Sequence, residues 1–265
     1  MSRVSAVVFD LDDTLMPEEA AIDAAFHATC HVAFPPSSKT AGTLTARVRT
    51  RAREAWRSSP AARHCGSVGI SSSEGLWGAF ATSGAHAAFF EGWLPTYRVN
   101  AWAFGLRDVG ADDGDLAARL SDIFAQEVRA RLSPYVGAVE AVRAVRMDYA
   151  VGLLTNGDSG VQREKIAKAG LKDEFDAVLV SGDIAVGKPD AAPFRRVLDI
   201  LGVRAAQAVM VGNSLTSDVL GSHRVGMRAV WVTDGQSTPR AARPDATVST
   251  LGELADALRE LGGRR

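Results

Sequence analysis

Cysteine and lysine are both scarce in this chain of 265 residues. The only two cysteines, Cys30 and Cys65, argue against a disulfide framework and against a zinc site built from cysteine. Arginine greatly outnumbers lysine, which occurs only at positions 39, 165, 168, 172 and 188. The placement of each lysine is therefore informative.

An excess of charge of one sign is also missing, because 30 basic residues face 31 acidic residues. The net charge of -1 argues against a general nucleic-acid or membrane-surface role, which usually requires a basic excess. No apolar run has the length that spans a bilayer. The first residues lead directly into a strand pattern, without an apolar signal segment or a small-residue cleavage site. We therefore expect a cytoplasmic protein.

Apolar residues make up 46% of the chain, which is ample for one large domain or two smaller ones. From about residue 148 onward, strand and helix patterns alternate with short connections. The expected strands are 149–154, 175–180, 208–211 and 228–232, and the expected helices are 161–169, 191–201, 217–225 and 251–261. Together with the apolar run at residues 7–9, this alternation predicts an α/β fold, a Rossmann-like doubly wound parallel sheet.

Between residues 17 and 133 the pattern changes to helical spacing without convincing strands. The expected helices are 18–34, which ends at Pro35-Pro36, then 43–56, 74–90, 95–105 and 116–132. We therefore predict an all-helical second domain over residues 17–133, inserted into a sheet domain of residues 1–16 and 134–265. The arginines at alternate positions from 47 to 53 spread around their helix, which predicts a solvated helix surface.

Polar side chains follow the strands of the predicted sheet, where functional groups collect in open α/β folds. Two carboxylates one residue apart end the first strand, and burying them together is unfavourable unless a cation or a proton offsets them. The other strands are followed by an amide, a hydroxyl, a lysine and a further carboxylate. Such a set would bind a divalent cation and an anionic group together, and its hard oxygen ligands favour Mg²⁺ over zinc. The residues are Asp10, Asp12, Thr155, Asn156, Lys188, Asn213 and Asp218.

Four segments in this order resemble the four motifs of the haloacid dehalogenase-like (HAD) hydrolase superfamily. The resemblance covers the sheet domain and points to the phosphatase branch, with a helical cap inserted after the first motif. Any one motif alone would be weak, but four in order at fitting intervals are strong. The segments are Phe9-Asp10-Leu11-Asp12-Asp13-Thr14-Leu15, Leu153-Leu154-Thr155-Asn156-Gly157, Gly187-Lys188-Pro189-Asp190 and Val211-Gly212-Asn213-Ser214-Leu215-Thr216-Ser217-Asp218.

The resemblance implies a role for each catalytic residue. Asp10 would be the nucleophile that forms an aspartyl-phosphate. Asp12 would protonate the leaving oxygen and then activate water. Thr155 and Asn156 would bind the phosphoryl group, and Lys188 would neutralise charge on the nucleophile and the phosphoryl oxygens.

The resemblance also implies a Mg²⁺ site. The ion would be held by Asp10, the backbone carbonyl of Asp12, Asp218 and Asn213. Asn213 departs from the family pattern, because many relatives carry Asp at this position. An amide supplies a ligand oxygen without the charge, so Asp218 becomes the more important carboxylate.

The expected function is a Mg²⁺-dependent phosphatase acting on a small-molecule phosphate monoester, such as a sugar, cyclitol, nucleotide or biosynthetic-intermediate phosphate. Asp12 argues against dehalogenation, which has no alkoxide to protonate. Lys39 is the only lysine near the start of the insertion, so phosphonate cleavage through a Schiff base is weakly supported. A sugar phosphomutase stays open, as does a catalytically weak ligand-binding relative, which Asn213 motivates.

The substrate would be chosen by the cap. Its arginine and aromatic side chains suit a polar ring, although such residues commonly only pack helices together. The sequence does not decide between a monomer and a homodimer. The candidate contacts are Arg63, His64, Trp77, Trp93, Tyr97 and Arg98, with Glu91 and Trp102 as further candidates.

Overall fold

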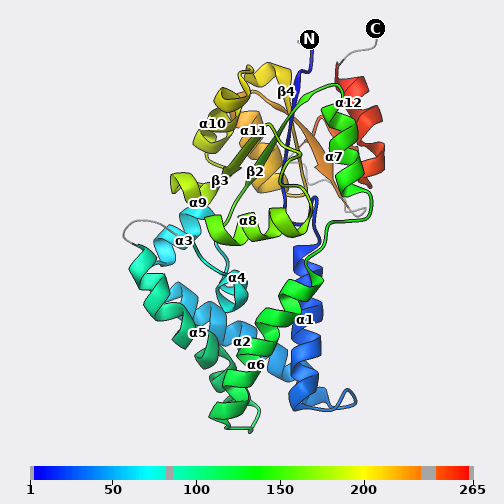
Figure 1. Ribbon diagram of the computed structural model, residues 1–265. Coiled ribbons are helices and arrows are strands. Elements are labelled where there is room, and N and C mark those ends of the chain that lie inside the picture. The colour runs from blue at the N-terminus through cyan, green and yellow to red at the C-terminus, as the bar shows by residue number, and fades with distance from the viewer. Residues whose placement is uncertain (1–2, 82–85, 234–242, 263–265) are drawn as a thin grey trace. The chain divides into compact units, whose positions relative to one another are not determined.

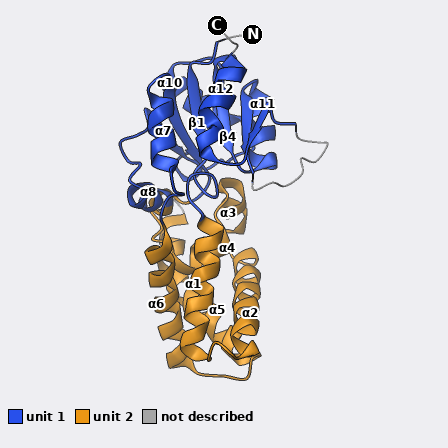
Figure 2. Ribbon diagram, turned by 90° about the vertical axis from the view of Figure 1, so that its right-hand side faces the viewer, with its two compact units in different colours: residues 1–17, 133–157, 162–265 blue, residues 18–132, 158–161 orange. Residues whose placement is uncertain are grey.

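The computed structural model describes residues 3–81, 86–233 and 243–262 (Figure 1). The chain forms two compact units (Figure 2). Unit 1 contains residues 1–17, 133–157 and 162–265, and unit 2 contains residues 18–132 and 158–161. Among the described helices, none has the length and apolar character needed to cross a membrane.

Unit 1 is built on a sheet of six parallel strands in the order β3-β2-β1-β4-β5-β6. β1 lies at its centre, where Ala6 pairs with Ala150 of β2 and with Ala208 of β4. Every residue of β1 and β4 is buried, as expected for parallel strands covered on both faces. The predicted α/β fold with a doubly wound parallel sheet is confirmed. The strands are β1 (Ala6–Phe9), β2 (Ala150–Thr155), β3 (Ala177–Val180), β4 (Ala208–Gly212), β5 (Arg228–Val232) and β6 (Ala246–Val248).

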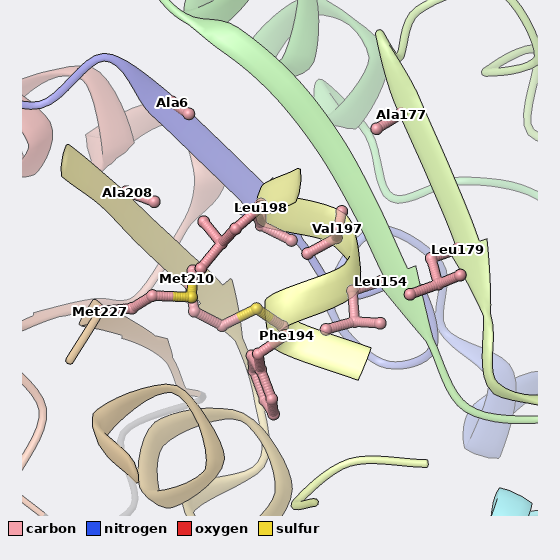
Figure 3. Packing of buried hydrophobic residues seen from close by; sticks show 11 residues of the cluster. Ala6, Leu154, Ala177, Leu179, Phe194, Val197, Leu198, Ala208, Met210 and Met227 are labelled. Atoms are coloured by element: carbon pink, nitrogen blue, oxygen red, sulfur yellow. The ribbon is translucent and has the colours of Figure 1, made fainter. Parts of the chain in front are cut away.

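Helices cover both faces of this sheet. On one face, α10 (Ala191–Leu201) packs on β2 and β3, and its Phe194, Val197 and Leu198, which recur at helical spacing, join a buried cluster with residues of β1 to β4 (Figure 3). Asp190 caps the start of α10, and Gly202 ends it in a left-handed conformation. On the other face, α7 (Ala138–Arg146) packs on β2 and against α12 (Leu254–Gly262). The remaining elements are α8 (Ser159–Lys168), α9 (Ser181–Ile184), η2 (Ala205–Gln207), the π-helical turn η3 (Leu215–Val219), α11 (Leu220–Val225) and η4 (Leu251–Glu253).

Unit 2 is helical throughout most of its described residues. Its long helices pack as a bundle in which α1 lies against α6 and α2 against α5. An aromatic core of Phe26, Trp102 and Phe124 joins three of them, with ring centroids 4.3 to 5.9 Å apart. Gly105 lets α5 approach α2, because a Cβ there would lie 2.6 Å from Cγ2 of Val48. The helices are α1 (Glu18–Ala33), α2 (Lys39–Arg57), α3 (Ala62–Val68), α4 (Ser72–Trp77), α5 (Ala87–Asp108) and α6 (Gly114–Arg131).

The helix predicted over residues 74–90 is wrong. A capping box of Ser71 and Glu74 starts α4, which ends at Trp77 because Gly78 is extended. Residues 78–81 are not helical, and residues 82–85 of this prediction lie outside the described part of the chain. α5 then continues through Pro95, where a break was expected. Pro95 removes one helical hydrogen bond, but it lies on the exposed side of α5, where water can satisfy the carbonyl.

Five elements were not predicted, and two of them, the four-residue α9 and the three-residue η2, are single turns. α3 is only seven residues long, and β6 is a three-residue edge strand, so neither carries a readable period. α7 has a clear apolar stripe at Ala138, Val142 and Val145, a helical signal that the sequence does contain. The predicted helix at 217–225 begins as the π-helical turn η3, and only α11 is a regular helix.

Candidate active site

The first motif turns sharply at the carboxyl end of β1. The N–H of Asp10 donates to the carbonyl of Val211 (2.9 Å), which extends the pairing with β4. The chain then bends back, because Leu15 N–H bonds to the carbonyl of Leu11 (2.8 Å) and Asp13 adopts a positive φ of 55°. The turn leaves both Asp10 and Asp12 at this edge of the sheet, with Asp10 the more deeply buried.

Lys188 joins two carboxylates. Its ammonium donates to Asp10 Oδ1 (2.6 Å) and to Asp218 Oδ1 (2.7 Å), and all three side chains are at least nine-tenths buried. The contact brings the first, third and fourth motifs together in unit 1. Two carboxylates and one ammonium leave this buried cluster with an excess of one negative charge when all three are ionised.

Asn156 fixes the backbone of Lys188. Its Oδ1 accepts from the Lys188 N–H (2.8 Å), and its Nδ2 donates to the Lys188 carbonyl (2.9 Å). The side chain predicted to bind phosphate therefore orients the lysine, and among the described residues its second amide hydrogen has no acceptor. Gly187 permits this approach, because a Cβ there would lie 2.8 Å from Asn156 Oδ1.

The fourth motif places Asp218 through the η3 turn. Ser214 N–H donates to Asp218 Oδ2 (2.9 Å), while Oδ1 receives the lysine. Gly212 is required beneath this carboxylate, since a Cβ at residue 212 would lie 2.4 Å from Asp218 Oδ2. The absence of a side chain at residue 212 therefore allows the Asp218 carboxylate to lie against the end of β4.

Asn213 is tied to the first motif by Thr14. The Asn213 N–H donates to Thr14 Oγ1 (3.0 Å), and the Thr14 hydroxyl lies 3.3 Å from Asn213 Oδ1 and 3.5 Å from Asp10 Oδ2. Trp231 Nε1 donates to the Asn213 carbonyl (2.8 Å) and steadies the same loop. The amide oxygen of Asn213 and the carboxylate of Asp10 therefore share one hydroxyl neighbour.

Asp12 contacts two residues that were not among the predicted site residues. Lys165 Nζ lies 3.0 Å from Oδ1 and 3.1 Å from Oδ2, and Gln162 Nε2 donates to Oδ2 (2.8 Å). Both residues lie on α8, three positions apart, so they share one face of the helix. The sequence signal for Lys165 is the scarcity of lysine, because each of the five lysines is then a candidate functional residue.

Thr155 is the last residue of β2 and is fully buried. Its Oγ1 accepts from Gln162 Nε2 (3.0 Å), so the same amide contacts both Asp12 and Thr155. Gly157 adopts φ +143°, and a Cβ there would lie 2.6 Å from this amide nitrogen. The second motif therefore needs its glycine to admit the Gln162 side chain.

The electrostatics of the cluster are dominated by burial. Burial raises the pKa of Asp10 to about 7; Lys188 opposes this increase and Asp218 adds to it. Burial also disfavours the Lys188 ammonium, but the two carboxylates outweigh it and raise the pKa of Lys188. Ionised Asp10 is therefore short of positive charge even with the lysine in contact.

The donors at this edge suit a hard divalent cation. Among the described residues, no three His, Cys, Asp or Glu side chains are grouped to hold a metal ion. The available set is instead two carboxylates, Asp10 and Asp218, supplemented by the Asn213 amide and the Asp12 carbonyl, which are all oxygen donors. The excess negative charge and the raised pKa of Asp10 are what an added cation would relieve, so the residues fit Mg²⁺.

The residues predicted to contact the substrate differ in burial within unit 2, and one group of them is packed between helices. Trp77, Tyr97 and Trp102 are buried in helix packing, and Tyr97 donates to the Ser72 carbonyl (2.7 Å). Trp93 stacks on Tyr97, with centroids 4.6 Å apart.

The others are more accessible. Arg63 is exposed, and His64 stacks on His86 with centroids 4.2 Å apart. Burial and the neighbouring His86 lower the pKa of His64. Arg98 donates to the Gly75 carbonyl (2.9 Å) and, with Glu91, lines a cavity of about 440 Å³. Phe80 and Phe90 form apolar walls of this cavity.

Comparison with known proteins agrees with the motifs. The profile of the haloacid dehalogenase-like hydrolase family matches residues 4–226. The phosphoserine phosphatase of Thermus thermophilus is 34% identical over 259 residues, which cover 95% of this chain and 99% of that protein. The pyrimidine 5'-nucleotidase of Escherichia coli (strain K12) is 31% identical over 138 residues, covering 51% of this chain and 61% of that protein.

A solved structure shows the same fold. The HAD-hydrolase of Bacillus subtilis bound to magnesium has a TM-score of 0.65 and 21% identity, and the match covers 97% of this chain and 99% of that chain. Both the family profile and the phosphoserine phosphatase extend over most of the sequence, so the predicted resemblance is confirmed. The chain therefore belongs to the haloacid dehalogenase-like hydrolase family.

Proposed function

We propose that this protein is a Mg²⁺-dependent phosphatase that hydrolyses a small-molecule phosphate monoester through an aspartyl-phosphate on Asp10. The contact of Lys188 with both Asp10 and Asp218 carries this proposal, because it sets a carboxylate nucleophile beside a fixed positive charge in a buried cluster. The similarity to phosphoserine phosphatase over nearly the whole chain supports the same reaction class.

Two balanced steps follow from the residues. An oxygen of Asp10 forms a bond to phosphorus while the bond to the leaving oxygen breaks, and Asp12 gives that oxygen a proton. Asp12 then takes a proton from water as the water oxygen bonds to phosphorus and the phosphorus–Asp10 bond breaks. Phosphate is released, and Asp10 and Asp12 return to their starting states.

The remaining residues stabilise charge in these steps. Lys188 offsets negative charge on Asp10 and on the phosphoryl oxygens, and Thr155 and Asn156 donate hydrogen bonds to the phosphoryl group. Mg²⁺, held by Asp10, Asp218, Asn213 and the Asp12 carbonyl, would supply further positive charge to the phosphoryl oxygens.

We assign catalysis to residues 1–16 and 134–265 and the choice of substrate to a cap domain of residues 17–133. The cavity of unit 2 supports this division, because its polar residues, Glu91 and Arg98, lie beside the aromatic walls of Phe80 and Phe90. Such a lining suits a small organic group that carries charge.

Phosphate release is the direct test. The panel is O-phospho-L-serine, a pyrimidine 5'-monophosphate and a set of sugar and cyclitol monophosphates, each with and without Mg²⁺. We expect release from at least one alkyl phosphate that depends on Mg²⁺. Asp10→Asn should abolish this release, whereas Asp199→Asn, an exposed carboxylate of α10, should leave it unchanged.

Two outcomes would contradict the proposal. Normal turnover by the Asp10→Asn variant would exclude Asp10 as the nucleophile. Conversion of a sugar phosphate to its isomer without phosphate release would identify a phosphomutase instead.

A further inference from the structure

Two side chains of α8 hold the carboxylate of Asp12. Lys165 approaches both carboxylate oxygens, at 3.0 and 3.1 Å, and Gln162 donates to Oδ2 at 2.8 Å. Both α8 residues are fully buried, whereas the Asp12 side chain retains 20% of its exposure. Neither Lys165 nor Gln162 belongs to the four motifs, and the two steps proposed above leave both without a role.

The contacts on the two oxygens of Asp12 are unequal. Oδ2 accepts hydrogen bonds from Gln162 Nε2 and Lys165 Nζ, whereas Oδ1 accepts from Lys165 Nζ alone. A carboxylate oxygen accepts through two lone pairs. Within the described residues, Oδ1 is therefore the oxygen that keeps a position for a proton, while Oδ2 anchors the group.

The orientation of the Gln162 amide supports a functional placement. Its Nε2 faces Asp12 Oδ2, Thr155 Oγ1 and the Asn156 carbonyl, so a reversed amide would direct its oxygen at a carboxylate and a carbonyl. In the adopted orientation Gln162 Oε1 is buried without a hydrogen-bond partner among the described residues. An unpaired buried acceptor is unfavourable, and an apolar side chain would avoid it. The role of Gln162 therefore lies in the hydrogen bonds that its Nε2 donates.

We propose that Lys165 and Gln162 are positioning residues that fix Asp12 in one rotamer, with Oδ1 as the atom that exchanges the proton. The proposal rests on the phosphatase activity proposed above. In the first step, the O–H bond at Oδ1 breaks as the leaving oxygen gains the proton. In the second step, Oδ1 receives the proton that water loses. Without the two donors, the carboxylate would sample other rotamers and proton transfer would slow.

The test compares two esters that differ in their need for a proton. An alkyl leaving group departs as an alcohol and needs the acid, whereas p-nitrophenolate departs readily without one. For each variant, kcat/KM is measured with Mg²⁺ for p-nitrophenyl phosphate and for O-phospho-L-serine, or for the alkyl phosphate of the panel that the wild type hydrolyses best. The ratio of the two values does not depend on the folded fraction of a preparation.

Lys165→Met and Gln162→Met remove the donors and keep similar volume. We expect each to lower the alkyl-to-aryl ratio by about tenfold or more, as part of the effect of Asp12→Asn, since general acid catalysis contributes roughly 10²- to 10⁴-fold. Lys168→Met, an exposed lysine on the same helix, should leave the ratio unchanged. In an Asp12→Asn background, Lys165→Met should have no further effect on the ratio, because the positioning acts through Asp12.

An unchanged ratio in both the Lys165→Met and Gln162→Met variants would overturn the inference, even if their total activity falls, because a merely structural loss affects both esters equally. An additional decrease in the ratio when Lys165→Met is combined with Asp12→Asn would also overturn it. Failure of the wild type to hydrolyse any ester of the panel would instead remove the proposed phosphatase function.

Discussion

The charge of Asp10 is predicted to destabilise the metal-free protein above neutral pH. The pKa of Asp10 in the folded chain is about 7, compared with 3.8 for an ordinary carboxyl. Between these values the folded protein holds a proton that the unfolded chain has released, so the free energy of unfolding falls as the pH rises. The penalty is absent below about pH 4 and complete above about pH 7.

The magnitude follows from the size of this difference. Moving a carboxyl pKa from 3.8 to about 7 corresponds to on the order of 4 kcal/mol. Asp10 is buried, so solvent does not screen this penalty, and the opposing attraction of Lys188 is already included. Asp10→Asn removes the charge while keeping the shape of the side chain. We therefore expect the metal-free variant to be more stable than wild type at about pH 8, but not at about pH 4.5.

Urea unfolding followed by circular dichroism, in the presence of a chelator, measures this effect. The quantity of interest is the difference in unfolding free energy between wild type and Asp10→Asn at each pH, which cancels the titration of all other groups. Asp199→Asn is the control, because its carboxylate is exposed on α10. Mg²⁺ should restore much of the wild-type stability at about pH 8 and have a smaller effect on the variant.

A difference that stays constant between these two pH values would refute the reasoning. It would show that the cluster of Asp10, Lys188 and Asp218 accommodates the second carboxylate without strain, and it would remove the electrostatic support for the cation. A difference of the opposite sign would show that the Lys188 contact outweighs burial.

Two further predictions concern the fourth motif. Asn213→Asp should lower the Mg²⁺ concentration for half-maximal phosphate release by about tenfold, since one added charge near a divalent ion is worth on the order of a kcal/mol; an unchanged Mg²⁺ requirement would place residue 213 outside the metal site. Gly212→Ala should destabilise unit 1 by about 1–3 kcal/mol through overpacking and should reduce phosphate release sharply, because the new Cβ would lie 2.4 Å from Asp218 Oδ2. Urea unfolding and the release assay check both effects, and a fully active, stable Gly212→Ala variant would contradict this geometry.

Most of the fold of unit 1 could be predicted from the sequence because its longer strands are largely apolar and its connections are short. The buried run at β1 and the alternation after residue 148 leave few arrangements other than a parallel sheet. Unit 2 was harder to predict, because Pro95 is a strong helix-breaking signal that the exposed side of α5 overrides. The end of α4 depends on the extended conformation of Gly78, which the sequence alone does not specify.

The candidate site was partly predictable for the same reason. Asp10, Lys188 and Asp218 follow strands of one parallel sheet, so their meeting at one edge follows from the topology. Lys165 and Gln162 belong to a helix and do not directly follow a strand in the sequence. Their contact with Asp12 depends on the rotation of α8, which no pattern of single residues reveals. The cap contacts also stay predictions, because aromatic residues at helical spacing give the same sequence pattern in a helical core and in a cavity wall.

The central place of β1 sets the order in which the protein can form during synthesis. Of the six strands of the sheet, β1 is synthesised first, yet its partner strands begin at Ala150 and Ala208. The helices of residues 18–132 contact one another and are all synthesised before β2, so they can pack together in the interval. The apolar residues Ala6–Phe9 must therefore stay unpaired until β2 and β4 have been made, which leaves the strand that precedes Asp10 open to aggregation during synthesis.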